Sequence, residues 1–475
     1  MSAKRIHREE YLYLPALTHN AAIIAWGAFF FKVEAKDGKE KWEKLDDDDL
    51  AKRADGRKQS IGESSEAYAA KATVFVTEVG SGNEQKIEVE ATNHAVVQGL
   101  KPDTEYTFRV VMRGKNGKGS EWAAGPLRDW HFDGSEGVMR VCDHGYENRF
   151  HTFPAQDTDA ANLTFAVIGD FGRGVKKPPK LPQCQRQVAE ALEAAYDQHR
   201  FRFILATGDI IYAKTFLKII TGGASGDEDD DWFYTYFQPY RYLLNRVPVF
   251  PVIGNHDDDD NEKSGDRDQI YDNLYLPTQF RELRDAQDAN LESGLFYRFH
   301  YGAEIEFVCL DTSKGEDGKC SIEHLQNQDF INRAFSIVTQ PRWRIPFSHH
   351  PAFCAGPQHG GLKELRRLFE QRSSTAGIRV TFSGHEHNFQ YSLADGIAHF
   401  LTGGGGKYRE SRPKDFADAK TQVWGGNDEG HFLLVEITGE QMKVTPIGHL
   451  ADGQLRHIRI NHVAGQQLSP PFLVS

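Results

Sequence analysis

The chain has 475 residues, of which 39% are hydrophobic, with 31 Phe and 17 Tyr. This length exceeds what one hydrophobic core usually organises, so we expect two domains, and the aromatic content excludes a chain that is disordered throughout. Fifty-six basic against 68 acidic residues give a net charge of −12, which argues against a nucleic-acid backbone as the main partner. Such a chain repels anions at long range, so a phosphate-bearing ligand would need local attraction, for example from bound metal ions.

Cysteine usage and apolar segments bear on the compartment. The five cysteines show no Cys-x-x-Cys spacing, so we expect no disulfide framework, although one bridge such as Cys309 to Cys320 stays open. The first 20 residues contain no apolar signal segment, and the longest apolar stretch, Ala21–Phe31, is too short to span a bilayer. We therefore expect a cytoplasmic protein without a membrane span, or an exported one if a leader has been removed. The oligomeric state stays open.

Residues 1–135 are predicted to form an all-β sandwich domain. Short apolar, β-branched and aromatic runs are separated by Gly, Asn, Asp and Pro turns, which is typical of strands. These runs are Ala21–Phe31, Ala72–Val79, Lys86–Ala91, Ala95–Val96 and Tyr106–Met112. The charged insert Lys36–Glu66, with its acidic run Asp46–Asp49, is expected to be an exposed, solvated loop.

After a linker at residues 136–161, strands and helices alternate, which predicts an α/β domain over residues 162–452. The expected strands are Leu163–Ile168, Phe201–Ala206, Val247–Ile253, Ile305–Leu310, Arg344–Phe347 and Arg379–Phe382. The expected helices are Cys184–His199, Trp232–Leu244 and Leu362–Gln371. Residues 453–475 carry no clear pattern and are treated as a tail.

Five short polar blocks of this second domain each follow an apolar run. They are Gly169-Asp170-Phe171-Gly172, Gly208-Asp209-Ile210-Ile211-Tyr212, Gly254-Asn255-His256-Asp257, His349-His350-Pro351 and Gly384-His385-Glu386-His387. Strand ends are where α/β sheets place ligands. The blocks offer carboxylate, phenol, amide and imidazole donors but no thiolate, which suits Fe, Mn or Zn. Together they hold enough donors for two ions that share a bridge, so the sequence predicts a two-metal hydrolase acting on a phosphoester.

No single block carries that prediction alone. Asp170 between glycines is compatible with a plain turn, and Tyr212 by itself is more often a packing aromatic. Asp209 has two oxygens that can bridge two ions, and His385 and His387 project to the same side of an extended segment. It is the occurrence of all five blocks at strand ends, in one order, that favours a site.

These blocks resemble those of the metallophosphoesterase superfamily, and specifically its purple acid phosphatase branch. That branch is marked by Asp-x-Gly, Gly-Asp-x-x-Tyr, Gly-Asn-His-Asp/Glu, Val-x-x-His and Gly-His-x-His, and Tyr212 provides the discriminating phenol. The resemblance covers about residues 162–450 and implies a four-layer αββα core. Pro346 departs from the family pattern, in which a Val precedes the His by three, yet the His-x-Pro spacing identifies His349 as the ligand.

The resemblance also implies two sets of metal ligands. The first set is Asp170, Asp209, Tyr212 and His387, and the second is Asp209, Asn255, His349 and His385. Asp209 is therefore the expected bridge. In the family the tyrosine-bearing site holds Fe(III), and its partner is Fe(II), Zn(II) or Mn(II).

Three further residues are candidates for catalysis. His256 would bind the phosphoryl group, and we expect Asp257 to orient His256. Members of the family that these blocks resemble carry a His about ten residues beyond the His-x-Pro ligand. In this chain that residue is His359, the candidate general acid for the leaving alkoxide. An ordinary loop histidine is the alternative for His359, and His350 is its rival.

The implied reaction is the attack of a metal-activated hydroxide on a small phosphoester. Phosphomonoesters are the leading substrate class, and a phosphodiesterase with the same metals is the alternative among enzymes. A binding protein with a vestigial site is the alternative outside them. The run Gly403–Gly406 before Lys407 lacks the spacing of a phosphate-binding loop, so we expect it to shape the chain near the site.

The preceding β domain has a resemblance of its own. The run Leu100-Lys101-Pro102-Asp103-Thr104-Glu105-Tyr106 is similar to the tyrosine corner of a fibronectin type III sandwich. In that corner the tyrosine hydroxyl bonds to backbone a few residues upstream. The resemblance covers roughly the first quarter of the chain.

Overall fold

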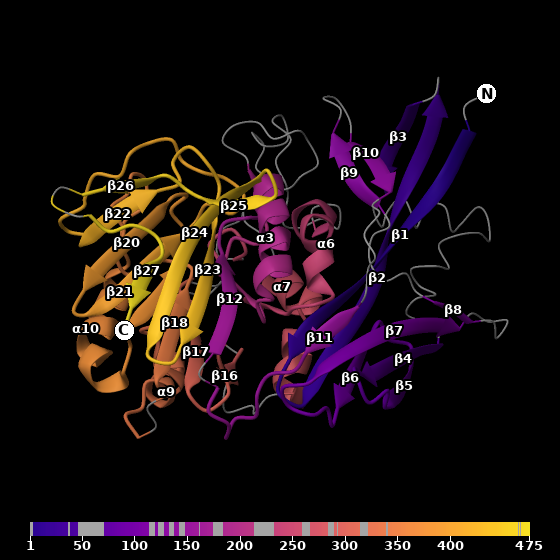
Figure 1. The fold of residues 1–475 in the computed structure, drawn as a ribbon, viewed down its shortest axis with the longest axis horizontal. Coiled ribbons are helices and arrows are strands. Elements are labelled where there is room, and N and C mark those ends of the chain that lie inside the picture. The colour runs from indigo at the N-terminus through magenta and orange to yellow at the C-terminus, as the bar shows by residue number, and fades with distance from the viewer. Residues whose placement is uncertain are drawn as a thin grey trace. The chain divides into compact units, whose positions relative to one another are not determined.

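The structure, a computed structural model, divides the chain into two compact units (Figure 1). It describes residues 3–36, 39–45, 71–113, 119–121, 128–132, 137–141, 148–160, 162–173, 184–212, 232–258, 267–283, 289–291, 293–313, 322–338, 341–463, 465 and 467–475. The first unit consists mainly of Met1–Phe153 and Glu228–Pro248. The second consists mainly of Pro154–Val175, Pro179–Asp227 and Val249–Ser475.

The N-terminal unit is built largely of antiparallel sheets, as predicted. One sheet contains β1 (Ala3–Leu17), β2 (Ala21–Lys36), β3 (Lys39–Lys44) and β6 (His94–Gln98). The other contains β4 (Lys71–Glu78), β5 (Glu84–Glu90), β7 (Glu105–Arg113), β8 (Gly119–Glu121) and β11 (Arg149–His151). A separate ribbon pairs β9 (Arg128–Phe132) with β10 (Gly137–Val141). Burial alternates along β7, which places one face of its sheet in the core of the unit.

Two predictions about this unit need correction. Lys39–Lys44, expected to lie in a solvated loop, forms β3, which extends the long strand β2 into a hairpin. The acidic run Asp46–Asp49 lies outside the described residues. The expected linker at residues 136–161 contributes β10 and β11, and β11 pairs with β7.

The predicted tyrosine-corner hydrogen bond is present. The backbone N–H of Lys101 donates to the hydroxyl oxygen of Tyr106 over 2.9 Å. The Tyr106 ring is buried and stacks on Phe150, with ring centroids 5.5 Å apart. The bond therefore ties the chain entering β7 to the core of the unit.

An aromatic helical segment also belongs to the N-terminal unit. The helix expected at Trp232–Leu244 consists of a π-helical turn, η1 (Phe233–Phe237), followed by α6 (Gln238–Leu244). The Phe237 ring lies 4.4 Å from that of Tyr11, and the Phe233 ring lies 4.9 Å from that of Phe29. Although the sequence analysis assigned this segment to the second domain, these rings attach it to β1 and β2.

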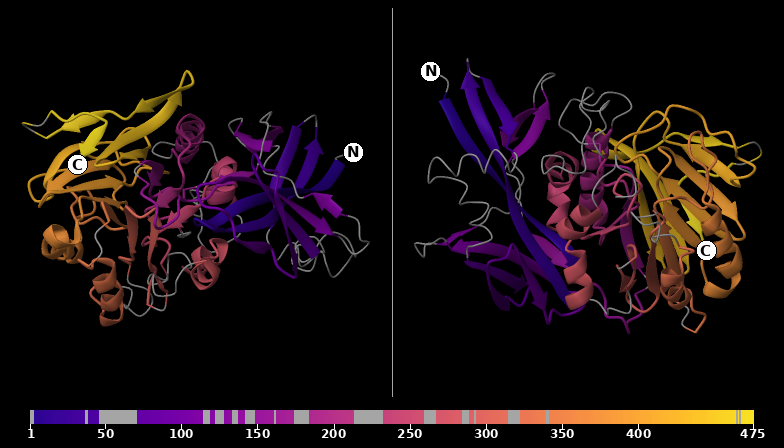
Figure 2. Two further views of the ribbon diagram at one scale, coloured as in Figure 1. Left: turned by 60° about the horizontal axis from the view of Figure 1, so that its bottom comes forward. Right: turned by 180° about the vertical axis from the view of Figure 1, so that it is seen from behind.

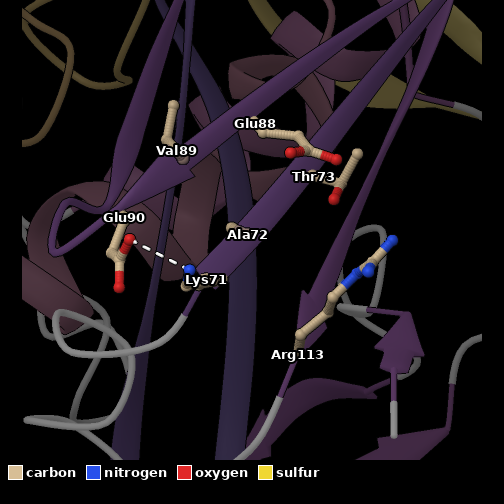
Figure 3. Close-up of a pocket in the computed structure, with 7 residues that line it drawn as sticks. All are labelled: Lys71, Ala72, Thr73, Glu88, Val89, Glu90 and Arg113. Carbon is tan, nitrogen blue, oxygen red and sulfur yellow. Dashed lines mark ion pairs between the residues drawn. The ribbon is translucent and has the colours of Figure 1, made fainter. Parts of the chain in front are cut away.

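A small hollow of about 150 Å³ lies on the sheet formed by β4, β5 and β7 (Figure 3). Its lining residues are Lys71, Ala72, Thr73, Glu88, Val89, Glu90 and Arg113. The Lys71 Nζ and a Glu90 oxygen are 3.3 Å apart, so these two charges neutralise each other. None of the predicted metal ligands lines this hollow.

The C-terminal unit contains two mixed sheets. The first has the order β14-β13-β12-β23-β24-β25, with β27 beside β24. Its strands are β12 (Asn162–Ile168), β13 (Ile204–Ala206), β14 (Val249–Pro251), β23 (Phe432–Thr438), β24 (Gln441–Ala451), β25 (Gln454–His457) and β27 (Phe472–Val474). Strands β12, β13 and β14 are parallel, so their carboxyl ends meet at one edge.

The second sheet has the order β15-β16-β17-β18-β19-β21-β20-β22-β26. Its first strands along the chain are β15 (Ala289–Asn290), β16 (Phe296–Tyr301), β17 (Ile305–Leu310), β18 (Trp343–Ser348) and β19 (Val380–Ser383). The later strands are β20 (Phe389–Ala394), β21 (Ile397–Thr402), β22 (Thr421–Gly425) and β26 (Ile460–His462). Strand β17 pairs in parallel with β18, and β18 pairs in parallel with β19, so the carboxyl ends of these three strands meet at one edge of this sheet.

Aromatic side chains join the two sheets face to face. Phe165 on β12 lies 5.2 Å from Phe307 on β17 and 5.9 Å from Phe382 on β19, measured between ring centroids. Both pairs are nearly perpendicular, a favourable geometry for aromatic rings. The core of the unit therefore lies between its two sheets.

Helices cover the outer face of each sheet, which completes the predicted four-layer αββα arrangement (Figures 1 and 2). Helix α3 (Gln185–His199) buries Val188, Ala191, Leu192 and Ala195 and lies against β24. Helices α9 (Leu325–Ala334) and α10 (Lys363–Ala376) form one apolar cluster with the other sheet. In that cluster Phe330 and Phe369 pack with Val308 and Ile397.

The remaining helical turns are α7 (Arg267–Asn273), α8 (Leu276–Thr278) and η2 (Gln279–Leu283). Residues 453–475, expected to be a tail, instead supply β25, β26 and β27 to the two sheets. Cys184, Cys309 and Cys354 are buried free thiols, so Cys309 takes no part in the bridge left open above. Across the described ranges, every helix falls short of the length and apolar character that crossing a bilayer requires.

We predict that Tyr106→Phe lowers the free energy of unfolding of the N-terminal unit by about 1 kcal/mol, the usual net worth of one hydrogen bond. Chemical denaturation followed by circular dichroism and aromatic fluorescence measures this. Tyr391→Phe is the control, because the Tyr391 hydroxyl makes no hydrogen bond within the described residues. Equal unfolding of wild type and Tyr106→Phe would show that the corner bond adds nothing to stability.

Candidate metal centre

Two buried aspartates begin the site at the ends of neighbouring parallel strands. Asp170 follows β12 and Asp209 follows β13, and each is fully or almost fully buried. Both adopt left-handed backbone conformations, with φ of 57° and 52°, which are uncommon for residues other than Gly. The N–H of Asp170 donates to the carbonyl of Gly208 over 3.0 Å, so the two turns support each other.

A first group of donors gathers around Asp170. The Tyr212 hydroxyl lies 3.1 Å from His387 Nε2 and 3.4 Å from Asp170 Oδ1. His387 Nε2 lies 3.5 Å from Asp170 Oδ1. Asp170, Asp209 and His387 offer ligand atoms that all lie within 4.8 Å of one another. This grouping matches the first predicted ligand set.

A second group gathers around Asn255. Its Oδ1 lies 2.9 Å from both His349 Nε2 and His385 Nδ1. These two ring nitrogens are 3.1 Å apart, and His349 Nε2 lies 3.4 Å from Asp209 Oδ1. Asp209 therefore adjoins both groups, which is the position that a bridging carboxylate requires.

The protonation of His349 shows that the second group fits a cation. His349 Nδ1 lies 2.8 Å from the carbonyl oxygen of Thr207, so this nitrogen must carry the proton and donate it. In the neutral imidazole, Nε2 then presents a lone pair. It points toward the Asn255 and Asp209 oxygens, which are also acceptors. A metal ion satisfies such converging lone pairs, and the bond to Thr207 orients the ring as a metal ligand needs.

The ionisation of the buried groups also fits metal binding. Burial, and then the charge of Asp209, raise the pKa of Asp170 well above its usual value. Burial opposes ionisation of Asp209 too, but its neighbours, among them the backbone N–H of His256, hold the pKa of that carboxyl at about 2. Burial lowers the pKa of His385 and of His387 well below the usual value, so both stay in the neutral form that coordinates metals.

His256 lies beside these ligands, and Asp257 has a role other than the expected one. The His256 ring centroid is 4.5 Å from that of Tyr212, and its backbone N–H donates to Asp209 Oδ1 over 3.0 Å. The buried Asp257 carboxylate accepts bonds from three backbone amides, those of Gly254, Ile210 and Ile211, over 2.9–3.2 Å. Its oxygens thus hold two ligand loops together, rather than orienting the His256 ring.

Both candidates for the general acid lie next to His385. The His359 ring centroid is 4.1 Å and the His350 ring centroid 4.3 Å from that of His385. His350 Nδ1 is engaged with Thr312 Oγ1 at 2.9 Å. The half-buried His359 ring has a pKa lowered by burial and raised in part by Glu386. The structure thus brings His359 to the site and leaves its ring free of hydrogen bonds to described residues.

Glu386 is a residue of the site that the sequence analysis did not identify. It is fully buried, and its Oε2 accepts the backbone amides of Gln358 and His359 over 3.0 and 2.8 Å. Its Oε1 accepts the amide of His387 and bonds to the guanidinium of Arg409. The only signal in the sequence was its position between two predicted ligand histidines. The expected extended segment, with both histidines on one side, is not formed, because the backbone at His385 is left-handed with φ of 75°.

The glycine run near residue 404 shapes the site, as expected. The amides of Gly405 and Gly406 donate to the carbonyls of Gly169 and Asp170 over 2.9 and 3.0 Å. A Cβ at Gly403 would lie 2.2 Å from the carbonyl oxygen of Glu386, so only Gly permits this approach. The run therefore supports the Asp170 turn by direct backbone contact.

Comparison with known proteins agrees with this geometry. Residues 163–389, which include every predicted ligand, match the model of the calcineurin-like phosphoesterase family. Comparison with curated protein sequences finds no significant match.

Two solved structures share the fold. One is a purple acid phosphatase from yellow lupin (Lupinus luteus) seeds, with 14% identity, coverage of 97% of this chain and 74% of that chain, and a TM-score of 0.56. The other is PhoD, with 12% identity, coverage of 95% and 88%, and a TM-score of 0.57. At such identities the likeness concerns the fold alone.

We predict that Asp209→Asn weakens binding of both metal ions while the fold persists. An amide supplies one neutral oxygen where a bridge needs two anionic ones. Metal content after exposure to excess Fe, Zn or Mn and buffer exchange measures this, with circular dichroism as the check on folding. Asp415→Asn, an exposed carboxylate, is the matched control and should bind as wild type does. Two ions retained in Asp209→Asn would contradict the bridging assignment.

Proposed function

Because residues 163–389 form a calcineurin-like phosphoesterase domain, we propose that this protein is a dinuclear-metal phosphatase that hydrolyses phosphomonoesters. One observation carries the proposal. Two groups of donors, one around Asp170 and one around Asn255, meet at the single carboxylate of Asp209. Intact donors in both groups argue against a binding protein with a vestigial site.

The chemistry of the donors suggests which ions they hold. Asp170, Asp209, Tyr212 and His387 form a mainly anionic oxygen-donor set, which suits Fe(III). Asn255, His349 and His385 add only neutral donors to Asp209, which suits Fe(II), Zn(II) or Mn(II). When bound, two such ions lower the pKa of a water molecule and polarise the phosphoryl group.

The remaining side chains bind the substrate and move protons. His256, beside Tyr212 and tied by its backbone to Asp209, is placed to bind a phosphoryl oxygen and stabilise its charge. His359, whose ring centroid lies 4.1 Å from that of His385, is placed to protonate the leaving alkoxide from its imidazole. Glu386 positions His359 by accepting its backbone amide, and Asp257 positions the loops that carry Asp209 and Asn255.

The role of His359 can be separated from that of a ligand. We predict that His359→Ala slows hydrolysis of an alkyl phosphate by about 10²-fold or more, because its leaving group needs a proton. The loss on 4-nitrophenyl phosphate, whose leaving group needs none, should be far smaller. Metal content should not change. His350→Ala is the parallel variant, since His350 lies equally near His385.

Equal losses on the two substrates would argue against a general acid at His359. Loss of metal would make His359 a ligand. The leaving-group effect appearing in His350→Ala instead would transfer the role to that residue.

The visible absorption spectrum of the iron-loaded protein tests whether Tyr212 is a metal ligand. A phenolate bound to Fe(III) donates charge to the metal under visible light, so the iron-loaded protein should be coloured. Tyr212→Phe keeps the buried ring and removes its oxygen, so we predict that the visible band disappears while part of the iron and reduced hydrolysis remain. Tyr236→Phe, a buried aromatic of the N-terminal unit, is the control and should keep the colour. Matching spectra of wild type and Tyr212→Phe at equal iron content would remove Tyr212 from the ligand set.

A further inference from the structure

Two cationic side chains near the Tyr212 side of the metal centre have no acidic partner among the described residues. Arg173 is three residues beyond Asp170, and its guanidinium carbon lies 5.5 Å from the centroid of the Tyr212 ring. The Arg173 Nε is buried without a hydrogen-bond partner. Lys407 directly follows Gly406, whose amide bonds to the carbonyl of Asp170. Its half-buried ammonium forms no ion pair within the described ranges.

A third cation nearby shows the contrast. Arg409 donates its backbone N–H to the carbonyl of His387 over 2.8 Å, and its guanidinium bonds to Glu386 and Gln358. Its charge is therefore compensated, and its side chain is held in place by the structure. Arg173 contacts the Tyr212 ring, but neither Arg173 nor Lys407 has an acidic partner among the described residues, so ion pairing there does not compensate their charges.

The surroundings of Arg173 and Lys407 disfavour the charged form of both side chains. Burial lowers the pKa of Arg173. Burial, followed by the charges of Arg173 and Arg409, lowers the pKa of Lys407 to about 8. Partly buried cations that repel each other are stabilised by an anion placed between them. Metal ions bound by Asp170 and Asp209 would use those carboxylates and add further positive charge, which strengthens the attraction for an anion.

The location of Arg173 and Lys407 distinguishes the anion that they would bind from the phosphoryl group that is cleaved. Both cations flank Asp170 and Tyr212, the ligands of one predicted metal, and neither approaches the ligands Asn255, His349 or His385 in any described contact. A phosphoryl group positioned by both metal ions and His256 would not need them. We infer that Arg173 and Lys407 form a subsite for a second anionic group of the substrate, so that the favoured phosphomonoesters also carry a carboxylate or a further phosphoryl group. This inference rests on the proposed phosphatase function and narrows its substrate class.

The test compares two substrates that differ by one carboxylate, phenyl phosphate and 3-carboxyphenyl phosphate, with the metal-loaded full-length protein. The wild type should hydrolyse the carboxylated ester with a kcat/KM about tenfold higher, the scale of one or two charge-assisted contacts. In Arg173→Gln/Lys407→Gln this ratio should fall to about one. Lys414→Gln, an exposed lysine seven residues beyond Lys407, is the matched control and should keep the wild-type ratio. The preference should also weaken as salt concentration rises.

A binding measurement keeps the subsite separate from turnover. Calorimetry with two non-hydrolysable probes, phenylphosphonate and 3-phosphonobenzoate, should show about tenfold tighter binding of the carboxylated probe by the wild type. That difference should be absent in the double variant. Lys407→Gln alone serves if the double variant fails to fold, and it should lose part of the difference.

The possible results of these experiments separate failure of the subsite from failure of the proposed phosphatase function. A wild type without preference for either carboxylated compound would overturn the subsite. So would a double variant that loses affinity and turnover equally for both members of each pair, because the cations would then act on the cleaved phosphoryl group. Failure of the wild type to hydrolyse either ester with Fe, Zn or Mn would overturn the proposed function instead, and the binding ratio would still decide the subsite.

Discussion

The arrangement of the C-terminal unit depends on the burial of two carboxylates that face the same small space. Asp170 and Asp209 are removed from water, and burial together with the charge of Asp209 raises the pKa of Asp170. Around them, Asn255 Oδ1 and the unprotonated Nε2 of His349 lie 2.9 Å apart, so their lone pairs converge. Buried groups of this kind are stable when a cation lies among them. Burial also lowers the pKa of His385 and of His387, so both imidazoles stay neutral, and the bond to the Thr207 carbonyl orients the ring of His349.

The fold provides this convergence through strand ends. Parallel pairing of β12, β13 and β14 delivers the turns of Asp170, Asp209 and Asn255 to one edge. The opposing sheet delivers His349 and His385 from the ends of β18 and β19, and the aromatic layer around Phe165 fixes the two sheets against each other. Left-handed backbone at Asp170, Asp209 and His385 costs conformational energy, which the surrounding structure must offset. It places three ligands in turns too tight for a regular strand.

Two buried acidic side chains outside the predicted ligand sets hold the loops of the site in place by hydrogen bonds. Asp257 accepts three amides from the loops that carry Asp209 and Asn255, and Glu386 accepts the amides of Gln358, His359 and His387. Each carboxylate accepts hydrogen bonds from backbone amides that would otherwise have no acceptor in these turns. Ligands on separate strands therefore keep a common geometry, although their loops have little regular secondary structure.

The sequence by itself was enough to predict which residues could donate to metal ions, because donor chemistry and strand-end position are both local properties. Apolar runs ending in Asp170, Asp209, Asn255, His349 and His385 were sufficient to predict one site and the layered α/β unit around it. It also gave the bond from Lys101 to Tyr106, whose partners are five residues apart. Only the tertiary structure decided the rest. The directions of the Asp257 and Glu386 carboxylates and the attachment of Phe233–Phe237 to the N-terminal unit depend on residues distant in sequence. So does the position of Arg173 and Lys407, two cations without an acidic partner among the described residues. The strands formed by residues 453–475 do as well, since their pattern is weak and the partners that order them lie elsewhere in the sheets.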